Sequence, residues 1–195
     1  MIITKIFHPL RSLTNEELMG RVAAKADERA YDELYNRNIK RLVGFIYRQT
    51  GRNEELAADL AQDTFLRIWS SREEFRPGAD FAPWMFTIAC NLCRNTFRHN
   101  GHEADYELHI AQTTDEATEP HIDQMLDGEA FDNALRKLLS TMMPDMRLLF
   151  SLRFEEELTV PQIAQAMTLA EGTVKSRLHT LTQTLKQKLT QYENI

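Results

Sequence analysis

Two cysteines and two histidines lie close together near the middle of the chain and could bind a metal ion. Cys90 and Cys93 are separated by two residues, and His99 and His102 follow with the same separation. Thiolates and imidazoles are preferred ligands of Zn²⁺, and closely spaced pairs of them are typical of zinc sites. The chemistry that this pattern would support is metal binding, in an enzyme or in a metal sensor.

The helical periodicity of the same stretch argues against that site. One apolar face of a helix would hold four residues spaced i, i+4, i+7 and i+11, namely Phe86, Cys90, Cys93 and Phe97. Cys90 and His102 are twelve residues apart, which is about 18 Å along a helix, whereas zinc ligand atoms lie about 2.0–2.3 Å from the ion. Both cysteines are therefore predicted to lie in the core, and no metal or other cofactor is expected.

The opposite side of this helix carries side chains that suit nucleic acid. An aromatic ring, amides and guanidinium groups recur there at helical spacing, in the order Trp84, Thr87, Asn91, Arg94, Asn95 and Arg98. Proteins that bind single strands combine aromatic platforms for the bases with cations for the phosphates. The alternative is an ordinary solvated face with one half-buried tryptophan, and periodicity alone does not separate the two.

The whole chain has the composition of a helical globular protein. Its 195 residues include seven glycines and six prolines, and long stretches have apolar residues at helical spacing, so an all-α fold is predicted. No apolar run approaches the roughly 20 residues of a membrane span, and the N-terminal stretch does not resemble a signal peptide. Two cysteines without an export signal favour the reducing cytoplasm, and no membrane insertion is expected.

The predicted helices form two small domains, residues 14–100 and 129–190, joined by an acidic linker, residues 101–128. The linker holds eight acidic residues and no Lys or Arg, so the rest of the chain carries a net charge of +2 although the whole carries −6. In the second domain a short helix, Val160–Met167, is followed by a four-residue break and a long basic helix, Gly172–Leu189. This is the helix-turn-helix arrangement, whose second helix enters the major groove of DNA.

Local signals place the remaining helices. Thr14 and Glu17 have the spacing of a capping box, which opens a first helix. The first domain would continue with helices over Asp27–Thr50 and Asn53–Ser70, a loop over Arg76–Ala82, and a helix from about Asp80 towards His99. The second domain would begin with a helix near 129–142 and a helix from Pro144 through Phe154.

Three blocks of the sequence resemble the extracytoplasmic-function (ECF) sigma factors, the small bacterial initiation factors that contain only regions two and four of the sigma-70 family. The blocks are DLAQDTFLRIW at 59–69, FRPGADFAPWMFTIACN at 75–91 and LTVPQIAQAMTLAEGTVKSRL at 158–178. They occur in the family's order and span most of the chain. The resemblance implies a region 2 domain before the acidic linker and a region 4 domain after it.

The resemblance assigns residues to three interfaces. Asp59, Gln62 and Asp63 match the segment that docks on the β′ clamp helices of core RNA polymerase, with Asp63 in place of Glu. The residues assigned to a flipped base and the open strand of the −10 element are Phe75, Arg76, Trp84, Asn91, Arg94, Asn95 and Arg98. Those assigned to duplex −35 DNA are Arg153, Thr173, Lys175, Ser176, His179 and Thr180. The alternative for the docking residues is an ordinary solvated acidic face. The alternative for Trp84 is a tryptophan that only anchors the core.

The function that the resemblance implies is transcription initiation without catalysis by this chain. The partners would be core RNA polymerase, contacted at the β′ clamp helices and the β flap, and promoter DNA. An anti-sigma factor is also expected, although no residue identifies it, and control through expression alone is the alternative. The alternative function is a stand-alone helix-turn-helix regulator that binds duplex operator DNA.

The sequence departs from the family's pattern at several DNA-binding positions, which limits what the resemblance implies about DNA binding. Thr168 stands in the turn where Gly is frequent, and His179 and Thr180 stand where an aromatic residue or Arg is frequent. Neither of the last two can make the bidentate contact to guanine that Arg makes, so the −35 preference cannot be carried over. The family usually has a run of Arg at the end of the helix that extends towards His99, and here only Arg94 and Arg98 are present. Because few phosphate contacts can form, weak and salt-dependent binding of DNA by the chain alone is expected.

Overall fold

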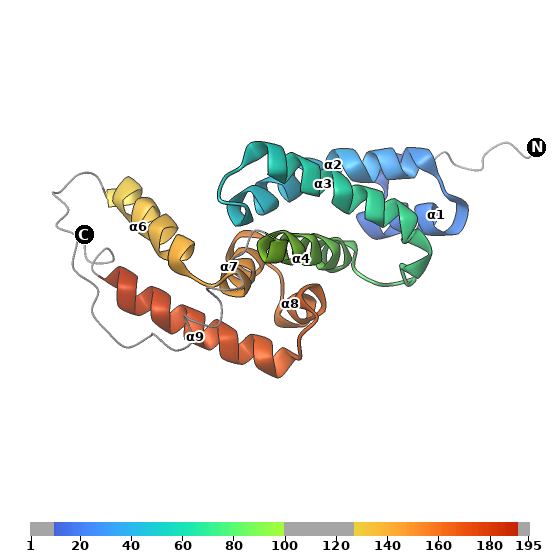
Figure 1. The fold of residues 1–195 in the computed structure, drawn as a ribbon. Coiled ribbons are helices and arrows are strands. Elements are labelled where there is room, and N and C mark those ends of the chain that lie inside the picture. Colours follow the sequence, from blue (N-terminus) through green and yellow to red (C-terminus); the bar gives the residue numbers. More distant parts are fainter. Residues whose placement is uncertain (1–9, 100–126, 191–195) are drawn as a thin grey trace, which may run out of the picture. The chain divides into compact units, whose positions relative to one another are not determined.

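The structure is a computed structural model that describes residues 10–99 and 127–190 (Figure 1). Every regular element in these two ranges is a helix, which confirms the predicted all-α fold. The chain divides into two units, of which the first comprises the residues up to Cys93 together with Gln165–Thr168, and the second comprises the rest. No helix in the described ranges is long and apolar enough to cross a membrane.

Side-chain caps fix where the helices of the first unit begin. The elements are η1 (Leu10–Ser12), α1 (Asn15–Lys25), α2 (Glu28–Gln49), α3 (Glu54–Ser70), η2 (Arg72–Glu74) and α4 (Phe81–His99), whose residues from Arg94 on belong to the second unit. Thr14 Oγ1 accepts a hydrogen bond from the Glu17 backbone N–H at 3.2 Å, and Glu17 Oε2 accepts one from the Thr14 N–H at 2.8 Å. This confirms the predicted capping box. Asp27 and Asn53 cap α2 and α3 by accepting hydrogen bonds from backbone N–H groups three residues on.

An apolar core fixes α4 against α2. Phe45 of α2 and Phe86 of α4 are fully buried, and their rings meet edge-on with centroids 4.8 Å apart. Cys90 and Cys93 of α4 are also fully buried, as the periodicity of this stretch predicts. Burying a large apolar side chain contributes roughly 1.5–3 kcal/mol, so this packing determines which side of α4 faces solvent.

Tyr31 of α2 fixes the orientation of α3. Its hydroxyl donates a hydrogen bond to the Phe65 carbonyl at 2.8 Å, and its ring contacts those of Phe65 and Trp69 edge-on. Burial, with smaller contributions from Tyr35 and Asp32, raises the pKa of Tyr31 from 10.0 to about 12. The hydroxyl therefore stays protonated at physiological pH and keeps donating to α3.

The second unit is built around the last long helix. Its elements beyond the end of α4 are α6 (Asp127–Thr141), α7 (Pro144–Phe150), η3 (Ser151–Glu155), α8 (Val160–Met167) and α9 (Glu171–Leu189). α9 packs beside α6 and α7. α6 corresponds to the helix predicted near 129–142 and begins two residues before it.

The helix predicted from Pro144 through Phe154 changes from an α-helix to a π-helix after Phe150. It is α-helical only as far as Phe150, after which η3 is a π-helix, in which the Glu156 N–H donates to the Ser151 carbonyl at 2.9 Å. A π-helical turn accommodates an extra residue within an otherwise regular helix. The spacing of apolar residues in the sequence does not reveal such an insertion.

A turn of three residues joins α8 to α9, one residue shorter than predicted because Glu171 is already helical. The Thr168 N–H donates to the Gln165 carbonyl at 3.1 Å, and the Leu169 N–H donates to the Ala164 carbonyl at 2.9 Å. This pair of bonds defines a Schellman motif, which requires left-handed backbone at its central residue. Thr168 has a φ of +56°, a conformation that a β-branched residue adopts only with strain.

Replacing Thr168 with glycine should therefore stabilise the protein. Left-handed backbone costs an L-residue roughly 1–2 kcal/mol, which exceeds the roughly 0.4–1 kcal/mol that glycine's freedom gives the unfolded chain. We expect the free energy of unfolding in urea to rise by about 0.5–1 kcal/mol. The control is Thr180→Gly, at an exposed position in the middle of α9, which should lower the free energy of unfolding. Destabilisation by Thr168→Gly would contradict strain in the turn.

Candidate nucleic-acid interface

The solvent-facing side of α3 carries the three residues assigned to polymerase docking. Asp59, Gln62 and Asp63 are all exposed, whereas Phe65 and Ile68 of the same helix are buried. Two carboxylates and an amide thus form an acidic stripe that can accept charge-assisted hydrogen bonds from a basic partner.

Leu66 extends this stripe with an apolar side chain that sequence reasoning missed. It is 56% exposed, and it lies three residues after Asp63 and seven after Asp59, on the same side of the helix. A helical wheel could have found it, because the wheel places Leu66 with Asp59 and Asp63 and away from Phe65 and Ile68. Asp59, Gln62, Asp63 and Leu66 are called the α3 face below. A large apolar side chain ringed by polar ones is the composition of a protein–protein contact.

The loop before α4 packs an aromatic pair. Phe75 is only 6% exposed, and its ring meets that of the half-buried Trp84 edge-on with centroids 5.2 Å apart. Arg76 is exposed. α4 begins at Phe81, one residue after the start predicted at about Asp80, and the loop predicted over Arg76–Ala82 therefore ends at Asp80. Phe75 is placed to support Trp84 from the core, and its contact with a flipped base stays a prediction.

The outer side of α4 carries the other residues assigned to the −10 strand. Asn91, Asn95 and Arg98 are exposed, and Arg94 is half-buried. Together with Trp84 they are called the α4 face. Amides can both donate to and accept from base edges, guanidinium groups can pair with phosphates, and an indole ring can stack on a base.

α4 keeps the cysteines and His99 apart. The helix runs without a break through His99, which is nine residues after Cys90, and both cysteines lie in the core. His102 lies outside the described residues, and among the residues that are described no group of three potential metal ligands occurs. The continuous helix supports the interpretation of Cys90 and Cys93 as core residues.

α9 presents a polar side, called the α9 face, that holds most of the residues assigned to duplex DNA. Lys175, Ser176, His179 and Thr180 are exposed, and Thr173 in the first turn is half-buried. Val174 and Leu181 are fully buried on the other side. The same helix therefore anchors itself by one side and offers donors and acceptors to solvent by the other.

Arg153 lies on η3 rather than on α9. Its side chain is exposed, and Nη1 donates a hydrogen bond to the Leu158 carbonyl at 3.0 Å. This bond ties the guanidinium to the loop that precedes α8 and restricts its freedom.

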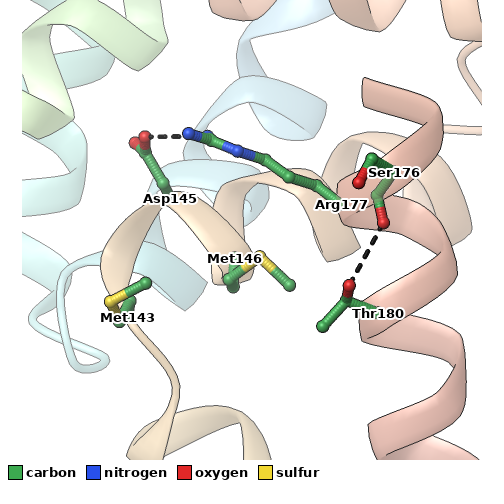
Figure 2. Close-up of a pocket in the computed structure, with 6 residues that line it drawn as sticks. All are labelled: Met143, Asp145, Met146, Ser176, Arg177 and Thr180. Atoms are coloured by element: carbon green, nitrogen blue, oxygen red, sulfur yellow. Dashed lines mark hydrogen bonds and ion pairs between the residues drawn. The ribbon is translucent and has the colours of Figure 1, made fainter. Parts of the chain in front are cut away.

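A pocket of about 170 Å³ lies beside the α9 face (Figure 2). It is lined by Met143, Asp145, Met146, Ser176, Arg177 and Thr180. Asp145 of α7 pairs with Arg177 of α9 through Oδ2 at 3.3 Å, and its Oδ1 accepts a hydrogen bond from Arg94 Nε at 2.9 Å. The two guanidinium groups therefore share one carboxylate, which offsets part of their positive charge.

Two family models match the chain, Sigma-70 region 2 over residues 34–103 and Sigma-70 region 4 over residues 132–180. RNA polymerase sigma factor CarQ of Myxococcus xanthus is 31% identical over 168 residues, which is 84% of this chain and 91% of CarQ. The ECF RNA polymerase sigma-E factor of Haemophilus influenzae is 26% identical over 184 residues, which is 91% of this chain and 96% of that protein. The first region model includes the α3 and α4 faces, and the second includes the α9 face.

Solved structures share the fold. The structure of CnrH in complex with the cytosolic domain of CnrY has a TM-score of 0.64 at 21% identity and covers 90% of this chain and 97% of that one. The sigma factor RpoE from Bartonella quintana, in complex with the anti-sigma factor NepR, has a TM-score of 0.56 at 23% identity and covers 82% of this chain and 96% of that one. Since both sigma regions match in order and the similarity to CarQ spans nearly all of that protein, this chain belongs to the ECF sigma factors of the sigma-70 family and is a transcription initiation factor.

Proposed function

We propose that this sigma factor binds core RNA polymerase through the α3 face and directs it to promoters through the α4 and α9 faces. The observation that carries the proposal is that all three sets of residues lie largely exposed on regular helices of one chain. A stand-alone regulator of duplex operator DNA would need only the helix-turn-helix, whereas this chain also contains region 2.

Docking would place the α3 face against the β′ clamp helices. The carboxylates of Asp59 and Asp63 would pair with basic side chains, and Gln62 would add a neutral hydrogen bond. Leu66, more than half exposed here, would become buried and supply apolar area at the centre of the contact. Region 4 would make a second contact with the β flap, so that the two domains are held on one enzyme.

At the −10 element the α4 face would trap a base flipped out of the duplex. A flipped base requires a ring or apolar wall beside it and a donor and an acceptor along its edge. Trp84, supported by the core residue Phe75, supplies the ring, and Asn91 supplies the amide. Asn95 and the cations Arg76, Arg94 and Arg98 would hold the neighbouring strand. Melting is then favoured because the protein binds the open strand more tightly than the duplex, and no covalent chemistry takes place on this chain.

At the −35 element the α9 face would enter the major groove of intact duplex. Ser176, His179 and Thr180 offer donors and acceptors to base edges, and Lys175 offers a cation to the backbone. Thr173 lies in the first turn of α9, where backbone N–H groups favour a phosphate. Arg153 would add a phosphate contact from η3.

Control by an anti-sigma factor is the mode of regulation that we propose. RpoE, which shares the fold, was solved in complex with the anti-sigma factor NepR, and CnrH was solved with the cytosolic domain of CnrY. A partner that covered the α3 or α9 face would block polymerase or promoter. Since RNA polymerase and the chromosome occupy the cytoplasm, we expect the chain to act there.

Run-off transcription with core polymerase and a pool of randomised promoters tests the proposal. With the factor present, we expect transcripts from a subset of templates that share two elements, one near −35 and one near −10. Core polymerase alone is the control and should not select them. Templates enriched for a single duplex element without any new start site would support the stand-alone regulator instead.

A further inference from the structure

The first turn of α1 contacts the start of α4 through one hydrogen bond. Glu16 Oε1 accepts it from the Phe81 backbone N–H at 3.1 Å, although the two residues are 65 positions apart in the chain. Glu16 is half-buried, and the Phe81 side chain is fully buried. The bond therefore joins two elements that the sequence does not connect.

The acceptor lies where α4 needs one. Phe81 is the first residue of α4, and the first N–H groups of a helix have no partner within the helix. A carboxylate there satisfies a donor and also interacts favourably with the positive end of the helix dipole. Because Phe81 directly follows the loop that begins after Phe75, the position of its N–H sets where the loop ends.

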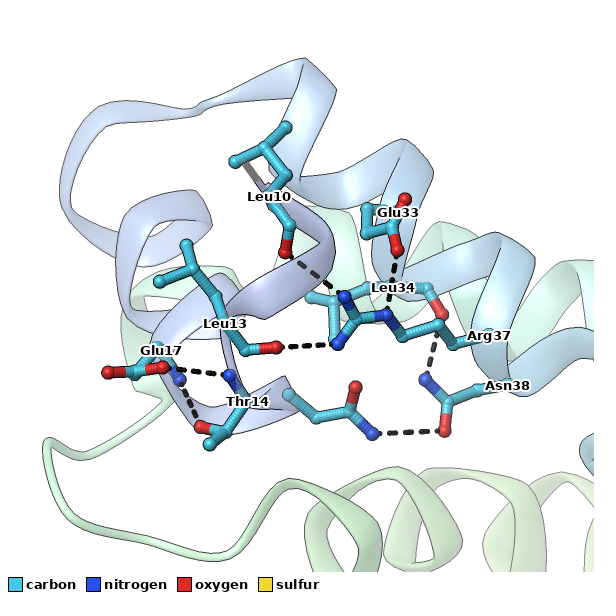
Figure 3. Close-up of polar contacts among 9 residues, drawn as sticks. Leu10, Leu13, Thr14, Glu17, Glu33, Leu34, Arg37 and Asn38 are labelled. Atoms are coloured by element: carbon cyan, nitrogen blue, oxygen red, sulfur yellow. Dashed lines mark hydrogen bonds and ion pairs between the residues drawn. The ribbon is translucent and has the colours of Figure 1, made fainter. Parts of the chain in front are cut away.

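The segment before Glu16 is held by a network of polar contacts (Figure 3). Arg37 of α2 donates from Nη1 to the Leu13 carbonyl at 2.6 Å and from Nη2 to the Leu10 carbonyl at 3.0 Å, while its Nε pairs with Glu33 at 2.8 Å. These bonds fix the segment that leads into α1. The Glu33 carboxylate in turn fixes the plane of the guanidinium.

The residues on either side of Glu16 are also bonded. Glu17 closes the capping box with Thr14. Asn15 Nδ2 donates to Oδ1 of Asn38 at 3.3 Å, and the buried Asn38 donates from Nδ2 to the Leu34 carbonyl at 2.8 Å. The first turn of α1 is thus attached to α2, so Glu16 has a fixed position from which to hold α4.

We propose that Glu16 is a positioning residue for capture of the −10 base. By capping α4 from α1, it sets the end of the loop and keeps the first turn of α4, which carries Trp84, in helical conformation. It touches no DNA itself. This inference rests on the base-capture role proposed above for the α4 face.

The test uses holoenzyme assembled from core polymerase and each variant. The probe is a fluorophore-labelled single strand that wild-type holoenzyme enriches from a randomised pool, and its Kd is measured by anisotropy. Open-complex formation on the matching duplex promoter and binding of core polymerase are measured in parallel. The variants are Glu16→Ala, Glu16→Gln, the control Glu28→Ala at an exposed position of α2, and Asn91→Ala.

Glu16→Ala should raise the Kd for the single strand and slow opening by about five-fold. Strand binding requires the capped first turn of α4, and the loss of one cap shifts the folding equilibrium of that turn by about this factor. Glu16→Gln retains an acceptor oxygen for the Phe81 N–H and should stay close to wild type, as should Glu28→Ala. Binding of core polymerase should be unchanged in all of them. A general loss of folding would instead weaken core binding together with strand binding.

Two results would overturn the inference. Wild-type strand affinity in Glu16→Ala, while Asn91→Ala binds weakly, would show that base capture is real and does not depend on Glu16. A Glu16→Gln variant as defective as Glu16→Ala would show that the hydrogen bond is not what matters. If Asn91→Ala also bound like wild type, the base-capture role would fail, and the role of Glu16 would fail with it.

Discussion

Asp63→Arg should abolish binding of the protein to core RNA polymerase. Asp63 is exposed on α3 beside Asp59, Gln62 and Leu66, so the substitution replaces an acceptor with a cation at the centre of the α3 face. Like charges brought together at an interface cost several kcal/mol, and we expect the affinity to fall by about 100-fold or more. A pull-down with tagged core polymerase, followed by a fluorescence titration, measures the loss.

The position is suited to this test because it takes no part in the core. Circular dichroism and the melting temperature of Asp63→Arg should match those of the wild type, since exposed substitutions away from special features change stability little. Glu28→Arg makes the same charge change at an exposed position of α2 and should leave binding intact. Retained binding by Asp63→Arg would mean that α3 does not dock, and a stand-alone regulator would then be favoured.

Asn91→Ala should impair transcription from duplex promoters and spare pre-melted ones. Asn91 is exposed on α4 between Trp84 and Asn95, and its amide is the group that would read the edge of a flipped base. A good amide–base pairing is worth about ten-fold in discrimination, and that energy is needed only while the strands must be separated. Abortive or run-off transcription from the two templates, made with and without a −10 bubble, gives the ratio.

Asn36→Ala, an amide truncation at an exposed position of α2, is the matched control and should not change the ratio. An equal loss on duplex and bubble templates by Asn91→Ala would show that this residue contributes to binding in general. In that case the base-capture role would have to move to another part of the α4 face.

The features that were predictable from the sequence are local ones. The capping box at Thr14 and Glu17 involves residues three apart, so its geometry follows from the helix itself. The burial of Cys90 and Cys93 followed from the period of a helix, which separates core positions from solvent positions without knowledge of the partners. The all-α fold is the sum of such local signals.

The features that were not predictable depend on contacts between distant segments. The Glu16 cap on Phe81 spans 65 residues, and the bond from Arg37 to the Leu10 carbonyl spans 27, so neither leaves a pattern in a short window. Leu66 was missed for a different reason, because only the polar residues of this stretch, Asp59, Gln62 and Asp63, were assigned to docking. The π-helical turn of η3 was missed because one inserted residue leaves the flanking periods almost unchanged.

The pairing of Arg177 with Asp145 has a consequence for how the factor searches the genome. Because Asp145 already offsets part of the positive charge of Arg177 and Arg94, these guanidinium groups release fewer counterions when DNA approaches and add less to sequence-independent affinity. The unattached subunit should therefore spend little time adsorbed on the bulk chromosome, where the excess of irrelevant sites would otherwise sequester it. When the factor is bound to polymerase, the α4 face and the α9 face bind the same promoter. Binding by one face raises the effective concentration of DNA at the other, so the two weak contacts together give an avidity that neither has alone.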